Sequence, residues 1–307
     1  MSEVRTVKPD GDEAWPALPL EAWRETYATL HMWTQVVGKI RLAQTPVVNH
    51  WWNVPLYVSA RGLTTSAMPH GERTFEIEFD FVGHELLFRA SDGVAESLPL
   101  APRAVADFYA EVMGTLRGMN LPVTIWTTPV EVPDPVPFEQ DRSHAAYDAE
   151  YANRLWRVVA QSARVFEEFR ARFVGKCSPV HFFWGSFDLA VTRFSGRRAP
   201  ARDGADSVTR EAYSHEVISH GFWPGSGNVQ HPAYYAYAAP EPAGFRDAAA
   251  VRPTAAFYNP ETSGFVLPYD QVRRADSPAR ALLDFMQTTY EAGANPGGWD
   301  RPALERG

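Results

Sequence analysis

One tryptophan-centred stretch occurs twice in this chain, and that repetition limits the fold more than any other feature of the sequence. Residues 46–58 read PVVNHWWNVPLYV, and residues 179–191 read PVHFFWGSFDLAV. An offset of 133 residues (179 minus 46) aligns the leading prolines and also aligns Trp51 with Trp184. Both stretches are rich in aromatic and β-branched residues, which favour β-strands. The sequence therefore predicts one strand in each half of the chain, at equivalent places.

A helical pattern precedes each of these stretches. Apolar residues recur at steps of three and four over residues 23–40 in the first half and over residues 151–173 in the second, which predicts two amphipathic helices. A Val-Gly-Lys triplet occurs in each half, at 37–39 and at 174–176. Its place after the helical pattern in both halves suggests that each helix ends there.

Further strands and a closing helix follow in each half. Phe75 to Phe81 alternates strictly between apolar and acidic residues, the pattern of an antiparallel strand with one buried face. Residues 88–99 and 257–268 match at an offset of 169 (257 minus 88), and helical patterns follow near residues 105–116 and 277–293. We therefore predict an α+β fold of two pseudo-symmetric repeats, each with helices packed on antiparallel strands.

Prolines mark the boundary between the halves. The segment 129–143 contains prolines at 129, 133, 135 and 137, and proline interrupts regular structure because it lacks the backbone N–H. Residues 197–232 have no counterpart in the first half, so they are interpreted as an insertion of the loop kind that often carries function. The predicted divisions are a flexible N-terminus (1–14), a first repeat (15–128), a Pro-rich linker (129–143), a second repeat (144–293) that contains the insertion, and a C-terminal tail (294–307).

The composition argues against several classes of function. The 307 residues carry 37 acidic and 29 basic side chains, a net charge of −8, whereas nucleic-acid binding usually needs a basic stripe. No apolar run approaches the roughly 20 residues that span a bilayer. The single cysteine, Cys177, cannot form an internal disulfide, which fits a reducing compartment. We therefore expect a cytoplasmic protein with a small-molecule ligand, no nucleic-acid partner and no membrane partner, and leave its oligomeric state open.

Histidines and tryptophans supply the candidate functional groups. In the predicted strands His50 and His181 fall on equivalent faces, and the insertion adds His215 beside Glu216. A histidine with a carboxylate partner is common equipment for proton transfer near neutral pH. We therefore expect a site in a cleft between the repeats. The candidate catalytic residues are His215, Glu216, His181 and His50, and the candidate ligand-binding residues are Trp51, Trp184, Trp223, Ser214 and Arg193.

A divalent metal is a further candidate. His50, His181 and His215 could hold it, because zinc and iron accept histidine ligands from distant positions in the sequence. His215 and His220 lie five residues apart, so they do not form the zinc-protease pair, whose histidines stand four apart on one helical face. The competing interpretation is that the strand histidines are core residues with hydrogen bonds to the backbone.

Several long motifs resemble a bacterial protein family. The family known as domain of unknown function 5996 has segments similar to LHMWTQVVGKIRLAQTPVVNHWWNVPLYVSARGLT, KCSPVHFFWGSFDLAVTRFSGRRAP, AYSHEV, GFWPG and LPYDQVR, and the resemblance runs from about Trp15 to Trp299. It implies a single family over nearly the whole chain, but no activity and no catalytic residue. The residues themselves favour an enzyme that acts on a small polar organic molecule in a His- and Trp-lined cleft between the repeats. The alternative is a non-catalytic small-molecule-binding or sensor protein.

Overall fold

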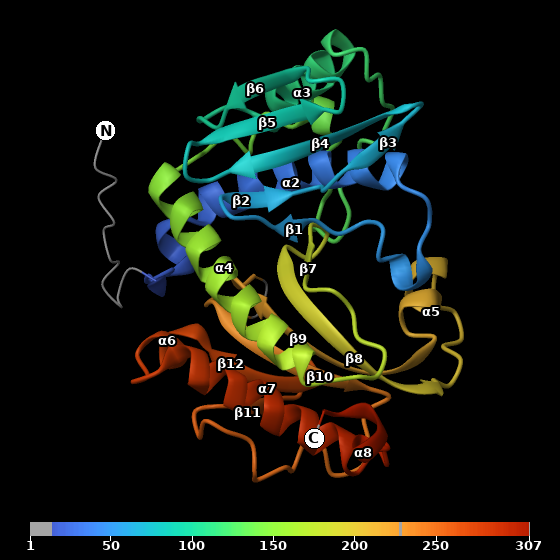
Figure 1. The fold of residues 1–307 in the computed structure, drawn as a ribbon. Helices are drawn as coiled ribbons and strands as arrows, with labels where there is room; N and C mark the ends of the chain where they lie inside the picture. Colours follow the sequence, from blue (N-terminus) through green and yellow to red (C-terminus); the bar gives the residue numbers. More distant parts are fainter. Residues whose placement is uncertain (1–13, 227–228, 307) are drawn as a thin grey trace, which may run out of the picture.

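Two antiparallel sheets, one from each half of the chain, form the framework of the molecule (Figure 1). The structure is a computed structural model that describes residues 14–226 and 229–306. Apart from Ala14, the predicted flexible N-terminus lies outside the described residues, as does Gly307 of the predicted tail. The mixture of helices and antiparallel strands confirms the predicted α+β class.

The first half folds as a helix, a sheet of short strands and a second helix. The strand order is β1-β2-β4-β5-β6, and β3 also pairs with β4. The two long helices, α2 and α3, pack against each other. The elements are η1 (Leu20–Ala22), α2 (Arg24–Gln44), η2 (Asn49–Trp51), β1 (Tyr57–Val58), β2 (Gly62–Thr64), β3 (Met68–His70), β4 (Arg73–Asp80), β5 (Glu85–Ala90), β6 (Ala95–Pro99) and α3 (Val105–Gly118).

The second half also begins with a long helix and closes with helices around a sheet. Its strand order is β11-β12-β10-β9-β8-β7. In the described part of the chain, no helix is long and apolar enough to cross a membrane. After the short η3 (Phe138–Gln140) of the Pro-rich segment, the elements are α4 (Ala149–Ala171), β7 (His181–Phe183), β8 (Asp188–Arg198), α5 (Ser207–Ala212), β9 (His215–Trp223), β10 (Ala233–Ala239), β11 (Phe257–Asn259), β12 (Gly264–Pro268), α6 (Tyr269–Arg273), α7 (Pro278–Ala294) and α8 (Arg301–Leu304).

The elements with the clearest periodicity are confirmed. The two predicted leading helices are α2 and α4, and the two closing helices are α3 and α7. In β4 the apolar face is buried as predicted, with Ile77 and Phe79 at 0% exposure. The acidic face is largely covered too, because Ser59 Oγ donates to Glu78 at 2.6 Å and Arg61 pairs with Asp80 at 2.7 Å.

The strand predicted over residues 46–58 is wrong. Only its last residues form β1, and the chain turns before that through η2. His50 and Trp51 adopt left-handed backbone angles, with φ of 58° and 60°. A local hydrogen bond accompanies the turn, because Asn53 Oδ1 accepts from the Val48 N–H at 3.2 Å. Side-chain bonds of this kind compete with strand pairing.

The single strand predicted over residues 179–191 is wrong as well. It is a hairpin in which β7 and β8 pair, and Phe187 in its turn has a φ of 57°. Ser186 Oγ donates to the Asp188 carboxyl across this turn. The two copies therefore have different local structures, and the prediction that His50 and His181 lie on equivalent strand faces is wrong, because His50 lies in η2 and His181 in β7. The strand orders of the sheets also differ, because β11 lies outside β12 at one edge.

The interpretation of residues 197–232 as a loop insertion is wrong. This segment contains α5 and the whole of β9, and β9 pairs with β8 on one side and β10 on the other. Gly221 is needed within β9, because ring atoms of Tyr235 lie 2.2 Å from the position that a Cβ would take there. The segment thus supplies an interior strand of the second sheet.

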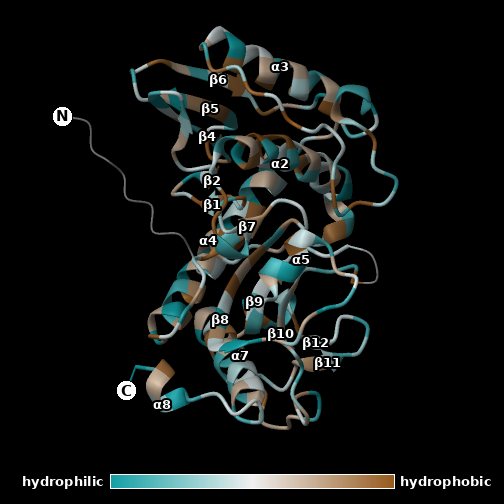
Figure 2. Cartoon of the chain, turned by 90° about the vertical axis from the view of Figure 1, so that its right-hand side faces the viewer, coloured by the Kyte–Doolittle hydropathy of each residue, from teal (hydrophilic) through white to brown (hydrophobic). Residues whose placement is uncertain are grey.

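One hydrophobic core runs through both halves. Figure 2 shows the halves stacked one above the other, with hydrophobic (brown) residues along β8 just below the junction. The β7–β8 turn inserts Trp184 against α2, where the indole lies 2.3 Å from the Cβ position of Gly38. The helix end predicted at residues 37–39 is therefore wrong. α2 continues to Gln44, and the glycine makes room for the indole, whose Nε1 donates to Val54 O at 2.8 Å.

The Pro-rich segment is irregular apart from the short η3, as its prolines predict. It is nevertheless held on α2. Gln35 binds both the N–H and the C=O of Val130, at 2.9 and 2.8 Å. Lys39 Nζ donates to Thr128 O at 2.7 Å. These contacts place the residues that follow, including Glu131, beside the β7–β8 turn.

Candidate functional site

The second sheet has two faces of different chemistry. One face packs on α7, where Ile218 lies 2.9 Å from the Cβ position of Gly293 and His220 Nε2 contacts Thr289 Oγ1 at 3.0 Å. Strand alternation sends the neighbouring side chains to the opposite side, which we call the distal face. Its side chains, from β7 to β10, are His181, Phe183, Asp188, Ala190, Thr192, Phe194, His215, Val217, Ser219, Trp223, Ala233, Tyr235, Tyr237 and Ala239.

A lysine and a histidine meet at one end of the distal face. Lys176 Nζ lies 2.6 Å from His50 Nε2. The other ring nitrogen of His50, Nδ1, lies 3.0 Å from Glu211 O and 3.3 Å from Ala212 O. A carbonyl oxygen only accepts, so Nδ1 carries the proton and Nε2 is left as the acceptor. Lys176 therefore donates to a neutral His50, whose pKa is lowered by burial and by the lysine charge.

Aromatic rings surround the ammonium of Lys176. Its Nζ lies 5.2 Å from the ring of Trp52 and 5.1 Å from that of Phe194, and Phe194 N–H donates to Lys176 O at 3.0 Å. Lys176 forms no ion pair with any carboxylate of the described residues. The residue is exposed, yet desolvation by its neighbours lowers its pKa. The result is an accessible amine that has a base as its polar partner.

A second histidine completes this end of the face. The ring centres of His215 and His50 lie 5.6 Å apart. Ser214 Oγ donates to Glu211 O at 2.8 Å, so it accepts from His215 Nδ1 at 3.0 Å and leaves Nε2 of that ring open. Desolvation, followed by the charges of Lys176 and Arg198, lowers the pKa of His215. We call Lys176, His50 and His215, with the rings of Trp52 and Phe194, the lysine–histidine cluster.

His181 lies beside this cluster, next to the rings of Trp52 and Tyr57. Its ring centre is 6.1 Å from that of Trp52 and 5.5 Å from that of Tyr57. The side chain is fully buried, and neither ring nitrogen has a hydrogen-bond partner among the described residues. Burial, reinforced by the charges of Arg41 and Arg170, lowers the pKa of His181 to about 3. It is therefore a neutral imidazole at ordinary pH.

The expected metal triad is not assembled. Nowhere in residues 14–226 and 229–306 do three or more His, Cys, Asp or Glu side chains lie where they could hold one metal ion. The lysine ammonium occupies the Nε2 side of His50 at 2.6 Å, and the Trp52 ring packs against both His50 and His181, with ring centres 5.3 and 6.1 Å away.

Other residues predicted for the site lie elsewhere. Glu216 follows His215 in β9 and so points to the opposite face, where it pairs with Arg197 at 2.7 Å. Arg193 is 1% exposed and stacks 3.4 Å above the Phe169 ring in the core. Glu216 and Arg193 adjoin cluster residues in the sequence, but their own side chains lie outside the cluster.

The predicted tryptophans are also dispersed. Trp184 packs in the α2 interface described above, and Trp51 is half-buried next to the cluster without being part of it. Trp223 and His215 end the same nine-residue strand, which separates them by about 26 Å at 3.3 Å per residue. One small molecule cannot contact both. The structure thus brings together His50, Ser214 and His215 from the predicted set, and adds Lys176 and Trp52.

A carboxyl cluster that the sequence did not reveal occupies the Trp223 end of the distal face. Asp188 accepts hydrogen bonds from Ser186 Oγ and from the Tyr235 hydroxyl. Burial raises the pKa of Asp188. Glu131 is exposed and has a φ of 55°, and desolvation followed by the charge of Asp188 raises its pKa. Neither carboxyl forms an ion pair within the described residues.

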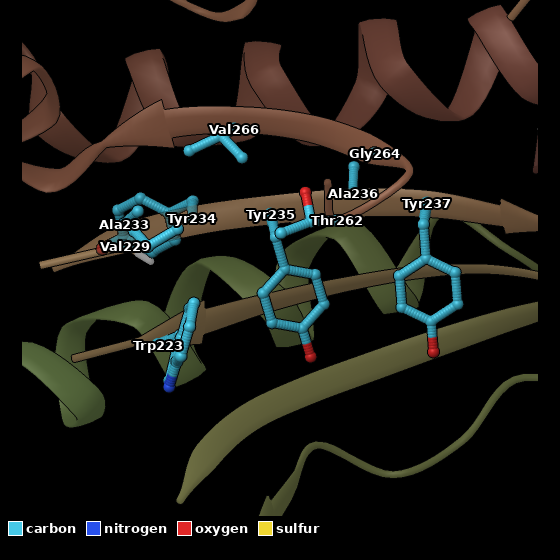
Figure 3. Close-up of a pocket in the computed structure, with 10 residues that line it drawn as sticks. All are labelled: Trp223, Val229, Ala233, Tyr234, Tyr235, Ala236, Tyr237, Thr262, Gly264 and Val266. Carbon is cyan, nitrogen blue, oxygen red and sulfur yellow. The ribbon is translucent and has the colours of Figure 1, made fainter. Parts of the chain in front are cut away.

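An aromatic pocket of about 170 Å³ adjoins this cluster. Figure 3 shows Tyr235 and Tyr237 side by side on β10, with their hydroxyl groups pointing in the same direction and Trp223 beside them. Tyr237 shares a hydrogen bond of 2.9 Å with the hydroxyl of Tyr213. In the sequence, the alternating tyrosines of YYAY (234–237) indicate this aromatic surface. The sequence does not indicate that Tyr235 binds Asp188, because Asp188 lies in a distant strand.

Comparison with known proteins identifies a family but no characterised relative. No curated protein and no solved structure matches the chain. Residues 15–306 match the sequence pattern of domain of unknown function 5996, described only as a family of unknown function. Because the match covers nearly the whole chain, this protein belongs to that family.

Proposed function

We propose that this protein is an enzyme that acts on a small polar organic molecule at the lysine–histidine cluster. The cluster lies between the halves, because His50 and Trp52 come from the first half and Lys176, Phe194 and His215 come from the second. The observation that carries the proposal is the contact of 2.6 Å between Lys176 Nζ and His50 Nε2. An amine held against a base of fixed tautomer is suited to proton transfer.

The geometry supports distinct roles for the two histidines. His50 accepts a proton at Nε2, because its Nδ1–H is committed to backbone carbonyls. His215 presents an open Nε2, which can hold or release a proton toward a bound molecule. The sequence suggested Glu216 as the partner of His215, but strand alternation separates these side chains. In the proposal, His50 and Lys176 replace Glu216 as the partners of His215 in proton transfer.

Two expectations from the sequence accompany this proposal. The repeated order of helix, strands and helix supports descent of both halves from one ancestral repeat, in spite of their different strand orders. A cytoplasmic location remains part of the proposal, supported by the single cysteine.

The carboxyl cluster favours a second candidate function, non-catalytic binding of a small molecule. The observation behind it is the 170 Å³ pocket lined by Trp223, Tyr235 and Tyr237. Pockets for small organic ligands are mainly aromatic and apolar, with a few polar groups. In this alternative the lysine–histidine cluster is structural.

Turnover of a compound mixture distinguishes the two functions. The purified protein is incubated with small organic acids, aldehydes, ketones, amines and amides, and mass spectrometry follows the loss of each compound. We expect a compound to be consumed by wild type and by His231→Gln, which changes an exposed histidine, but not by His50→Asn or His215→Gln. Asparagine suits position 50 because it tolerates a positive φ. Consumption that persists in His50→Asn would overturn the proposal, and binding without consumption that is lost in Tyr235→Phe would favour the second candidate.

A further inference from the structure

We propose that the amine of Lys176 forms an imine with small carbonyl compounds that carry a carboxylate, such as α-keto acids. The inference rests on the function proposed above and names the chemical class of its substrate. It follows from the surroundings of the amine, from the two histidines beside it and from the charges at this end of the distal face.

Lys176 is the accessible lysine of the described residues. The chain has three lysines, at positions 8, 39 and 176, and Lys8 lies outside the described residues. Lys39 is 4% exposed, and its Nζ donates to Thr128 O below the ring of Trp126, at 4.3 Å. Burial lowers the pKa of Lys39 to about 8, but the same burial shields its amine from a carbonyl compound. Lys176 is exposed and has no carboxylate partner there to hold it in the charged form.

The two histidines supply the proton transfers that imine formation needs. The Lys176 ammonium passes a proton to His50 Nε2, and the neutral amine nitrogen forms a bond to the carbonyl carbon. Neutral His215 takes a proton from the added nitrogen at Nε2 and passes it to the carbonyl oxygen, which becomes a hydroxyl group. The hydroxyl group takes the proton held by His50 and leaves as water while the C=N bond forms. Both rings end neutral, as they began, and the imine nitrogen keeps one proton.

Positive charge near the amine favours a substrate with a carboxylate. Arg198 lies opposite His215 in the pairing of β8 with β9, so its fixed positive charge lies beside this histidine, and Lys176 adds a second positive charge until its amine gives up a proton. The carboxylate that contacts the cluster is Glu211, whose Oε1 accepts from the His50 N–H at 3.2 Å. Local excess of one charge raises the local concentration of a ligand of the opposite charge. The rings of Trp52 and Phe194 border the amine on its apolar side.

Reductive trapping tests the inference directly. The full chain is incubated at pH 7 with glyoxylate or acetaldehyde and cyanoborohydride, which reduces an imine to a stable secondary amine. Peptide mapping by mass spectrometry then gives the rate of labelling at each lysine. We expect glyoxylate to label Lys176 faster than Lys8 or Lys39 and faster than acetaldehyde does. His50→Asn should slow labelling of Lys176 by about 100-fold, near the lower end of what positioned proton transfer contributes, while His231→Gln should not.

The outcomes separate this inference from the proposed function. Labelling confined to Lys8 and Lys39, or a Lys176 rate that is unchanged in a folded His50→Asn protein, would overturn the inference. Equal rates with glyoxylate and acetaldehyde would overturn the preference for a carboxylate. Consumption of a compound that needs His50 but survives in Lys176→Arg would leave the enzyme proposal standing and refute the imine. Fast trapping at Lys176 without turnover of any compound would support the imine and refute the enzyme proposal.

Discussion

Lowering the pH should weaken this protein steeply, because buried histidines are held in the neutral state, three of them with pKa values lowered to about 3 or 4. His181, His220 and His31 are 0%, 1% and 7% exposed. Burial lowers the pKa of His31 to about 4 and those of His181 and His220 to about 3, from 6.5. Between these values and 6.5 the unfolded chain binds protons that the folded chain does not. The stability from these groups is therefore complete above pH 6.5 and is lost as the pH falls toward 3.

The magnitude at pH 5.0 follows from the same shifts. There the histidines of the unfolded chain are almost fully protonated, 1.5 pH units below their ordinary pKa, while the folded ones remain almost neutral. At about 1.36 kcal/mol per unit, each histidine removes about 2 kcal/mol of unfolding free energy. The three together remove about 6 kcal/mol, a large part of the roughly 5–15 kcal/mol that stabilises a typical protein.

Replacing His181 by leucine isolates one of these contributions. Its ring nitrogens have no partner in the described part of the chain, so an apolar side chain of similar volume should cost less than about 1.5 kcal/mol at pH 7.5. Between pH 7.5 and 5.0 the variant should then lose about 2 kcal/mol less than wild type. Equilibrium urea unfolding at both pH values measures the difference, with His231→Gln as the exposed control. A His181→Leu protein with the same pH dependence as wild type would refute the reasoning.

Two further substitutions test the packing and the buried carboxyl. Gly38→Ala should destabilise the protein by about 1–3 kcal/mol, because the Trp184 indole lies 2.3 Å from the new Cβ, whereas the nearest atom at Gly114 of α3 is 3.9 Å away. Gly114→Ala should therefore stabilise by up to about 1 kcal/mol, and thermal or urea unfolding that ranks the two variants the other way would contradict the packing. The unfolding free energy of Asp188→Asn should increase relative to that of wild type as the pH rises from 4 to 8. The pKa of Asp188 in the folded wild type is raised above 3.8, so ionisation of the buried carboxyl destabilises wild type over this range but not the variant. Unfolding free energies at pH 4 and 8 give the gain, and a gain that does not change with pH would count against a buried carboxyl.

Elements whose own periodicity matches their burial could be predicted from the sequence. α4 carries an apolar stripe that matches its buried positions. The periodicity of α2 and β4 also predicts the right element, although both are buried on more than one face. In contrast, β9 was missed because polar side chains interrupt its pattern. Ser219 and His220 are 2% and 1% exposed, and their partners, Thr192 Oγ1 at 2.9 Å and Thr289 Oγ1 at 3.0 Å, come from β8 and α7. Such partners satisfy buried polar groups, but a single sequence does not show them.

The candidate site was partly predictable for the same reason. The sequence singled out His50 and His215 by residue type, without showing what they contact. In the sequence Lys176 is only the last residue of a repeated triplet, since its role depends on a contact with a histidine 126 residues away. The sequence alone also carries no sign that Asp188 is buried. Its burial depends on Tyr235 in β10 and on a segment held by α2.

The two repeated stretches lie against each other, and this contact explains why they have different structures. Leu56 and Phe182 exchange backbone hydrogen bonds of 2.9 Å, and Trp184 Nε1 donates to Val54 O at 2.8 Å. If both stretches formed the same extended strand, neither could supply the turn that His50 and Trp52 need to reach the second sheet. The left-handed backbone at His50 turns its ring toward Glu211 and Lys176. The lysine–histidine cluster therefore depends on the difference between the copies, so the proposed activity should be absent from either half of the chain alone.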